Sequence, residues 1–379
     1  MAITEKASEL GIEMFVLDDG WFGKRNDDTS SLGDWSIDKN KLPGGLNSLV
    51  DKIKIQGMTF GIWVEPEMIS PNSDLYKMYP DWAIAVPGRT PHKGRHQFVL
   101  DLSKEAVCNY LIQIFSQLFS SADIRYVKWD MNRNMTDIYS NTLSADRQGE
   151  VAYRYMLGLY RIMNELTDSF PHIIFEGCSG GGGRFDPGIL HYMPQMWASD
   201  DTDAIERMYI QYATSIVYPA SSICAQVSDV PNHQVGRVTP MTLRGHVAMS
   251  GMFGYSLNLA KISEEDESAI KEQVQLYKKI RHIIQKGDQY RLINPFDNRS
   301  CSWMFVDEDK NQSVIFYFNK LAKPNAELRR LKLKGLDENK IYLVDGKEYA
   351  GSTLMHFGLY LPENEKDFES KLWVIKAVE

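Results

Sequence analysis

Carboxylate side chains follow nearly every short apolar run in the first half of the chain. Each run is of the kind found in buried strands, and the acids at their ends are Asp18, Asp19, Glu65, Glu67, Asp101, Asp130, Glu176, Asp200, Asp201 and Asp203. A single carboxylate at a strand end is often a helix cap or a hydrogen-bond acceptor in a loop. Functional residues of a parallel α/β barrel lie just beyond the carboxyl ends of its strands, so the whole series indicates a site there.

Such a series could hold a metal ion, perform acid and base catalysis, or bind a ligand rich in hydroxyl groups. A catalytic metal usually recruits histidine, but no histidine stands at HExxH-like spacing from these acids, so we expect neither a metal nor an organic cofactor. Tryptophans also lie near the strand ends, namely Trp21, Trp63, Trp129 and Trp197. An aromatic face packs on the C–H surface of a sugar ring, and the combination therefore favours a carbohydrate ligand. One or two of the four are expected to be core residues instead.

Two of the carboxylates fit the opposite roles that retaining glycoside hydrolysis requires. That reaction needs an ionised nucleophile and a protonated acid about 5 Å apart. Asp130 ends an apolar strand with Lys128 on the same face, and a nearby cation keeps a carboxylate ionised. Asp200 follows Trp197 and precedes two further aspartates, and like charges and an apolar partner favour the protonated form that a general acid needs.

A glycine run stands between Cys178 and Arg184. It lacks the GK[ST] ending of a phosphate-binding loop and opens no evident helix. We interpret it as a place where the backbone closely approaches a ligand, with a flexible surface loop as the alternative.

Composition and charge exclude several classes of protein. The 379 residues include 42 basic and 50 acidic side chains, a net charge of -8, which is the opposite of the basic footprint of a nucleic-acid binder. No apolar run approaches the ~18 residues of a membrane span, and the polar start is unlike a signal peptide. The four cysteines lie far apart without a CxxC pair, which indicates reduced thiols. We therefore expect a cytoplasmic protein without membrane or nucleic-acid partners.

Strands and helices alternate through most of the chain. The predicted strands are 12–17, 60–64, 98–100, 124–129, 173–176, 196–198 and 223–227, with helices between them. Short apolar strands alternating with helices predict a parallel sheet covered on both faces, and hence an α/β fold of the (β/α)8 TIM-barrel type. Seven strands are one fewer than a closed barrel has, and the chain opens with a helix, so the first strand is predicted to be missing.

The pattern changes after a last long helix. This helix is predicted to begin at Ser263, with Asp266 in a capping-box-like position, and to end near residue 284. Alternating strands follow at 301–306, 313–319, 328–333, 340–344 and 372–375. They predict a small antiparallel β-sandwich. The predicted domains are thus a barrel at 1–285 and a β-sandwich domain at 286–379.

The motifs resemble those of the bacterial α-galactosidases of glycoside hydrolase family 36, the melibiases. The matching segments, in family order, are Phe15 to Gly23, Gly61 to Met68, Lys128 to Arg133, Cys178 to Phe185, Ser199 to Asp203 and Pro231 to Gln234. They span the whole barrel segment, and their joint occurrence is very specific. The final segment, with Gly351 to Met355, looks like the small C-terminal β-domain of the family.

The resemblance implies a role for individual residues. It makes Asp130 the nucleophile and Asp200 the acid/base, in agreement with the physical argument above. The implied substrate-binding residues are Asp18, Asp19, Trp63, Arg95, Lys128, Cys178 and Gly180. The two aspartates are implied to bind the O4 and O6 hydroxyls of galactose, the tryptophan to lie against the sugar, and the arginine and lysine to lie near other hydroxyls and the nucleophile. The cysteine and the glycine loop are implied to crowd the C2 substituent, which favours galactose over its N-acetyl derivative.

The implied function is a retaining α-galactosidase that releases terminal α-linked galactose from sugars such as melibiose or raffinose. Its α-galactoside substrates are the expected partners, and homo-oligomers are an expectation for the full-length family members. Compared with the family, the chain begins inside the first barrel helix, without the N-terminal β-sandwich domain. Two alternatives therefore stay open, an inactive or weakly active sugar-binding fragment and a transglycosylase similar to raffinose synthases.

Overall fold

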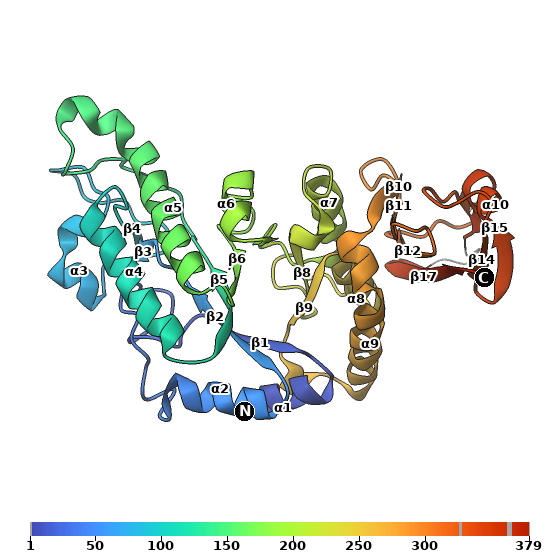
Figure 1. The fold of residues 1–379 in the computed structure, drawn as a ribbon, viewed down its shortest axis with the longest axis horizontal. Helices are drawn as coiled ribbons and strands as arrows, with labels where there is room; N and C mark the ends of the chain where they lie inside the picture. The colour runs from blue at the N-terminus through green and yellow to red at the C-terminus, as the bar shows by residue number, and fades with distance from the viewer. Residues whose placement is uncertain (1, 326–327, 362–365, 379) are drawn as a thin grey trace. The chain divides into compact units, whose positions relative to one another are not determined.

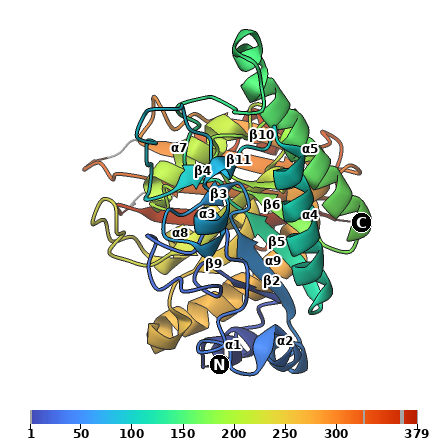
Figure 2. The same cartoon turned by 90° about the vertical axis from the view of Figure 1, so that its left-hand side faces the viewer.

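The computed structural model describes residues 2–325, 328–361 and 366–378. The chain divides into two compact units, one consisting mainly of residues 12–196 and the other mainly of residues 197–379. Figures 1 and 2 show their helices and strands, and each unit is described by itself.

The main sheet has seven strands in the order β1-β2-β5-β6-β7-β8-β9. These strands are β1 (Met14–Leu17), β2 (Thr59–Val64), β5 (Ile124–Trp129), β6 (Ile174–Gly177), β7 (Gln195–Trp197), β8 (Ile223–Ser228) and β9 (Met252–Ser256). The neighbours from β1 to β7 pair in parallel, and so do β8 and β9. Parallel strands connected by helices are the pattern of a TIM-type barrel, so the predicted fold class is confirmed.

One strand predicted for this sheet is wrong. Residues 98–100 contain β4 (Phe98–Val99), which pairs antiparallel with β3 (Met68–Ile69) in a separate two-stranded sheet. The seventh strand is instead β9, which the sequence analysis missed. The apolar residues of β4 are buried, but a run of three cannot distinguish a sheet strand from a buried connecting segment. In β9, partial exposure and a central glycine weaken the strand signal.

The first unit places its long helices beside the strands that carry the predicted site. The helices before β7 are α1 (Ala2–Glu9), α2 (Gly45–Ile55), α3 (Asp74–Met78), α4 (Glu105–Ser120), α5 (Val151–Ser169) and α6 (Pro187–Tyr192), with short 3-10 helices at Pro80–Trp82 and Ala145–Glu150. Figures 1 and 2 both show α4 and α5 side by side. Phe115 of α4 is fully buried, and its ring lies 6.2 Å from that of Trp129 at the end of β5. This packing holds the end of β5 in place.

The second unit combines helices with an antiparallel sheet. Its helices are α7 (Ala204–Thr214), α8 (Met241–Met249), α9 (Glu264–Lys286) and α10 (Gly351–His356), with 3-10 helices at Ala220–Ser222 and Leu259–Lys261. The Ser263 hydroxyl accepts a hydrogen bond from the backbone N–H of Asp266 at 3.1 Å, so the predicted start of the long helix is confirmed. The sheet has the order β10-β11-β12-β17-β14-β15, and β13 pairs with β16 in a separate ribbon. The strands are β10 (Asp288–Ile293), β11 (Ser300–Val306), β12 (Gln312–Asn319), β13 (Arg330–Leu331), β14 (Ile341–Val344), β15 (Lys347–Ala350), β16 (Leu359–Tyr360) and β17 (Glu369–Ala377).

Both faces of this six-stranded sheet are buried along β11 and β12. Because side chains alternate along a strand, Trp303 and Phe305 of β11 join a core with residues of α8 and α9, whereas Met304 and Val306 join a second core with residues of β13, β16 and α10. The predicted domain division between residues 285 and 286 stays a prediction. In the described ranges, no helix is long and apolar enough to cross a membrane.

Candidate active site

Strand register brings predicted site residues next to one another in the first unit. Trp63 of β2 pairs with Lys128 of β5, which in turn pairs with Glu176 of β6. In a parallel sheet, residues in register project from the same face, so the three side chains form a row close to the carboxyl ends of their strands. Asp130 follows β5 directly, and its backbone N–H donates to the carbonyl of Val64 at 2.8 Å.

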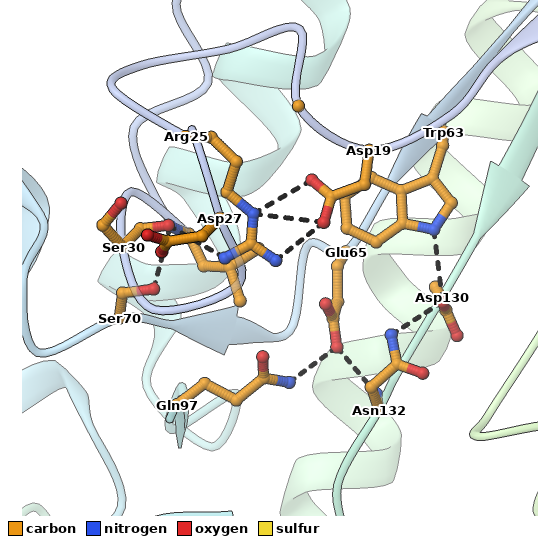
Figure 3. Close-up of polar contacts among 12 residues, drawn as sticks. Asp19, Arg25, Asp27, Ser30, Trp63, Glu65, Ser70, Gln97, Asp130 and Asn132 are labelled. Carbon is orange, nitrogen blue, oxygen red and sulfur yellow. Dashed lines mark hydrogen bonds and ion pairs between the residues drawn. The ribbon is translucent and has the colours of Figure 1, made fainter. Parts of the chain in front are cut away.

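Asp130 accepts hydrogen bonds from several groups, which include the Cys178 thiol. The indole Nε1 of Trp63 lies 3.2 Å and the amide Nδ2 of Asn132 2.7 Å from its Oδ2, and the backbone N–H of Met131 lies 2.9 Å from its Oδ1. Figure 3 shows the tryptophan and the asparagine pointing toward this carboxylate. The Asp130 side chain is buried, and donors of this kind compensate a carboxylate for the loss of water. The arrangement suits a rigidly held nucleophile.

Lys128 forms an ion pair with one of the predicted carboxylates. Its Nζ lies 3.1 Å from Oδ2 of Asp18. Burial alone would lower the pKa of Lys128, but the carboxylates of Asp18, Glu176 and Asp130 raise it above its ordinary value. The ammonium group therefore stays charged and offsets part of the negative charge of the site.

Asp19 is fixed by a residue to which the sequence analysis gave no role. The guanidinium of the buried Arg25 donates hydrogen bonds to the Asp19 carboxylate from Nη2 at 2.8 Å and from Nε at 3.0 Å. Its Nη1 donates to the carbonyl of Ser30 at 2.9 Å. Figure 3 shows this fork. The two-pronged geometry restricts the carboxylate to one orientation. Asp18 is the more exposed of the pair, with 64% of its side chain accessible.

Cys178 is buried next to Asp130. Its backbone N–H donates to the carbonyl of Trp129 at 2.8 Å, which fixes the start of the glycine loop against β5. Burial and the neighbouring Asp130 carboxylate raise the pKa of the Cys178 thiol, so it stays protonated. Gly180 and Gly181 have φ angles of +53° and +86°, which favour glycine, and the space beside Gly180 is open.

Glu67 anchors the far end of the glycine loop. It is fully buried and binds Arg184 through two contacts of 2.8 Å each. The Trp129 indole Nε1 donates to the same carboxylate at 2.9 Å, and the hydroxyl of Tyr155 on α5 does so at 2.5 Å. The Glu67 carboxylate thus connects the glycine loop, the end of β5 and α5 through hydrogen bonds.

Asp200 lies after β7 in the second unit, and Trp197 is one of its partners. The Trp197 indole Nε1 donates to Asp200 Oδ1 at 3.0 Å. The Arg207 guanidinium lies 4.7 Å from the Trp197 ring and donates to the backbone carbonyl of Cys224 at 2.7 Å. Burial lowers the pKa of Arg207 to about 10. The sequence analysis treated Trp197 as an apolar neighbour of Asp200. In the structure, Trp197 also donates a hydrogen bond to the Asp200 carboxylate.

The aspartates that follow Asp200 have structural roles. Asp203 is buried and caps α7 by accepting the backbone N–H groups of Ile205 and Glu206 at 3.0 and 3.1 Å. It also forms an ion pair with Arg237, so the Asp203 carboxylate has a cationic partner of its own. Asp201 accepts the backbone N–H of Asp203 at 3.0 Å.

Arg95 stands apart from the other predicted residues. It is exposed, with a φ angle of +47°, in a turn closed by backbone hydrogen bonds between Gly94 and Gln97. In the parts of the chain that the structure describes, no hydrogen bond joins it to the residues around Asp130. Its sugar-binding role stays a prediction, as do the roles of the other site residues.

Asn132, Arg25 and Glu65 are among the residues of this site without a predicted role, although the signal for each is visible in the sequence. Asn132 stands two residues after Asp130, Arg25 six residues after Asp19, and Glu65 belongs to the series of acids at strand ends. Their partners are set by tertiary contacts, which spacing does not reveal. Over the described residues, no group of three or more histidine, cysteine, aspartate or glutamate side chains is arranged to hold a metal ion.

Comparison with known proteins identifies the family. A family model described as Melibiase matches residues 1–287, and a model described as the glycosyl hydrolase family 36 C-terminal domain matches residues 300–375. The α-galactosidase AgaA of Geobacillus stearothermophilus is 54% identical over 378 residues, which are 100% of this chain and 52% of AgaA. The α-galactosidase 1 of Pediococcus pentosaceus is 49% identical, over 99% of this chain and 52% of its own length. The chain thus spans about half the length of these relatives.

Solved structures of the same family are also similar to this chain. The crystal structure of AgaA has a TM-score of 0.98 and 54% identity, covering 100% of this chain and 53% of AgaA. A variant of AgaA in complex with raffinose also has a TM-score of 0.98 at 54% identity, with 99% and 52% covered. The chain belongs to the melibiases, glycoside hydrolase family 36.

Proposed function

We propose that this chain carries the catalytic machinery of a retaining α-galactosidase, a glycoside hydrolase acting on terminal α-linked galactose. The observation that carries the proposal is the buried Asp130 carboxylate, held by Trp63, Met131 and Asn132, in a chain matched by the melibiase model. Raffinose and stachyose are bound in crystal structures of AgaA variants, which supports α-galactosides such as melibiose and raffinose as substrates here. A cytoplasmic location, homo-oligomers and the absence of nucleic-acid partners stay predictions.

In the proposed reaction, Asp200 donates its proton to the glycosidic oxygen while the bond from this oxygen to C1 breaks. An oxygen of Asp130 forms the new bond to C1, which gives a covalent galactosyl-aspartate and releases the rest of the sugar as an alcohol. Asp200, now ionised, accepts a proton from water, whose oxygen attacks C1 and releases galactose and free Asp130. The hydrogen bond from Asn132 holds the nucleophile in place between cycles, and Lys128 stays positively charged nearby.

An aryl α-galactoside tests both roles. Asp130→Asn should lower kcat by roughly a thousandfold or more, whereas Asp74→Asn, on the exposed surface, should leave it unchanged. With azide as external nucleophile, Asp130→Ala should form β-galactosyl azide by direct displacement, and Asp200→Ala should form α-galactosyl azide from the covalent intermediate. The configuration of the azide product therefore separates the two roles.

Two results would contradict the proposal. Full activity of Asp130→Asn would remove the nucleophile assignment. A folded wild-type chain that binds galactose in calorimetry but turns over no aryl galactoside would support the alternative of an inactive sugar-binding fragment, which the sequence analysis left open.

A further inference from the structure

Glu65 is a buried carboxyl group beside the proposed nucleophile for which the reaction above has no use. It follows directly after β2 and is 1% exposed. Figure 3 shows its side chain between Gln97 and Asn132, close to Asp130. Burial of a carboxyl group normally lowers the stability of the fold, so a buried Glu65 indicates a functional role.

One oxygen of Glu65 accepts two hydrogen bonds. The amide Nε2 of Gln97 and the backbone N–H of Asn132 both lie 2.7 Å from Oε1. The side chain of the same Asn132 donates to Asp130 Oδ2, also at 2.7 Å. Glu65 therefore holds the backbone of the residue whose side chain holds the nucleophile.

The surroundings of Glu65 favour its protonated form. Burial, and secondarily the charge of Asp130, raise the pKa of Glu65 to about 7. The hydrogen bonds from Asn132 and Gln97 act in the opposite direction and limit this rise. Glu65 can therefore keep a proton close to neutral pH, next to the carboxylate of Asp130.

We infer that Glu65 is a positioning residue for the Asp130 nucleophile and that it acts through Asn132. The inference rests on the proposed role of Asp130. A displacement of about 1 Å at a reacting group can cost on the order of a hundredfold in rate, so a residue that sets the place of Asn132 should affect kcat without touching substrate.

Two conservative variants separate position from charge. Glu65→Gln keeps the length of the side chain and an acceptor oxygen for both donors, but cannot ionise. Glu65→Asp keeps an ionisable carboxyl group but withdraws the acceptor by one methylene group. With an aryl α-galactoside we expect Glu65→Asp to lower kcat by about 10- to 100-fold with KM within about threefold, and Glu65→Gln to restore kcat to within about fivefold of wild type.

Crystal structures of both variants supply a readout that needs no turnover. The distance between Asn132 Nδ2 and Asp130 Oδ2 should stay near 2.7 Å in Glu65→Gln and exceed hydrogen-bonding range in Glu65→Asp. An unchanged distance in Glu65→Asp would overturn the positioning role, whether or not the wild-type chain is active. A lack of activity in the wild-type chain would count only against the proposed function. A greater loss of kcat in Glu65→Gln than in Glu65→Asp would also overturn it, because charge would then matter more than position.

Discussion

At the scale of single residues, Glu65 gives the fold a pH dependence that can be measured without substrate. Its pKa is about 7 in the folded chain against an ordinary value of 4.5. Below about pH 4.5 both the folded and unfolded states hold the proton, and the preference of the folded state for the protonated acid contributes fully to stability. That contribution declines as the pH rises and is lost above about pH 7, where both states are ionised.

Glu65→Gln should remove this contribution. The free energy of unfolding of wild type minus that of the variant is expected to fall by on the order of 1–3 kcal/mol between about pH 5 and pH 8. Urea unfolding of both proteins at the two pH values measures the difference. A difference that stays constant, or grows with pH, would show that the Glu65 pKa is not raised in the folded state.

Single-residue chemistry was predictable where it is local in sequence. The alternation along β5 places Lys128 two residues before Asp130, and both residues contribute to the charge of the site. Contacts over a long separation were not predictable. The Trp63 indole reaches Asp130 across 67 residues, and only the pairing of β2 with β5 brings the two together.

At the scale of elements, the Glu67–Arg184 pair connects the glycine loop to β5 and α5. Only 15% of the Arg184 side chain is exposed and Glu67 is fully buried. Breaking a buried ion pair from one side leaves an uncompensated charge, which typically costs about 3–5 kcal/mol. We therefore expect Arg184→Met to lower the free energy of unfolding by about that amount.

A surface pair provides the matched control. Lys77 and Asp74 also form a 2.9 Å ion pair, but their side chains are 62% and 69% exposed. Lys77→Met should therefore change the free energy of unfolding by less than about 1 kcal/mol. Chemical denaturation of the two variants in parallel checks the contrast, and equal losses would mean that the Glu67–Arg184 contact does not stabilise the fold.

Element assignment was most accurate where several signals agreed. The run of β5 from Ile124 to Trp129 is predicted to the residue, since it is apolar, alternating and bounded by polar positions. The start of α4 shows the limit, because Lys104 directly precedes the helix although the neighbouring Ser103 is of a residue type that often caps helices. The Ser103 hydroxyl instead donates to Asp101 at 2.5 Å, and a serine beside an aspartate has a choice of partners that spacing cannot decide.

At the scale of the whole molecule, the core of the second unit crosses the interval between the two family models. Residues 288–299 separate the matched segments, yet Val247 of α8 and Ile280 of α9 share one core with Trp303 and Phe316 of the antiparallel sheet. Removing the sheet would expose this apolar surface on both helices to water.

A chain ending at Gly287 should therefore be unstable. We expect it to associate in analytical ultracentrifugation and to unfold at a lower temperature than the full chain, since one side of a shared core is lost. The full chain with Phe357→Ser, a change at an exposed position outside that core, serves as the control. Identical melting temperatures for the truncated and full chains would show that the sheet does not support the helices.

The chain also contains its own optical reporters. Two of its eight tryptophans, Trp63 and Trp197, donate their indole N–H groups to Asp130 at 3.2 Å and to Asp200 at 3.0 Å. Indole emission depends on the electric field at the ring, so gain or loss of a proton by either carboxylate is coupled directly to a fluorophore. The two carboxylates proposed to exchange a proton and a covalent bond with the sugar are thus each in contact with a natural probe of their charge, and no label needs to be introduced to follow them.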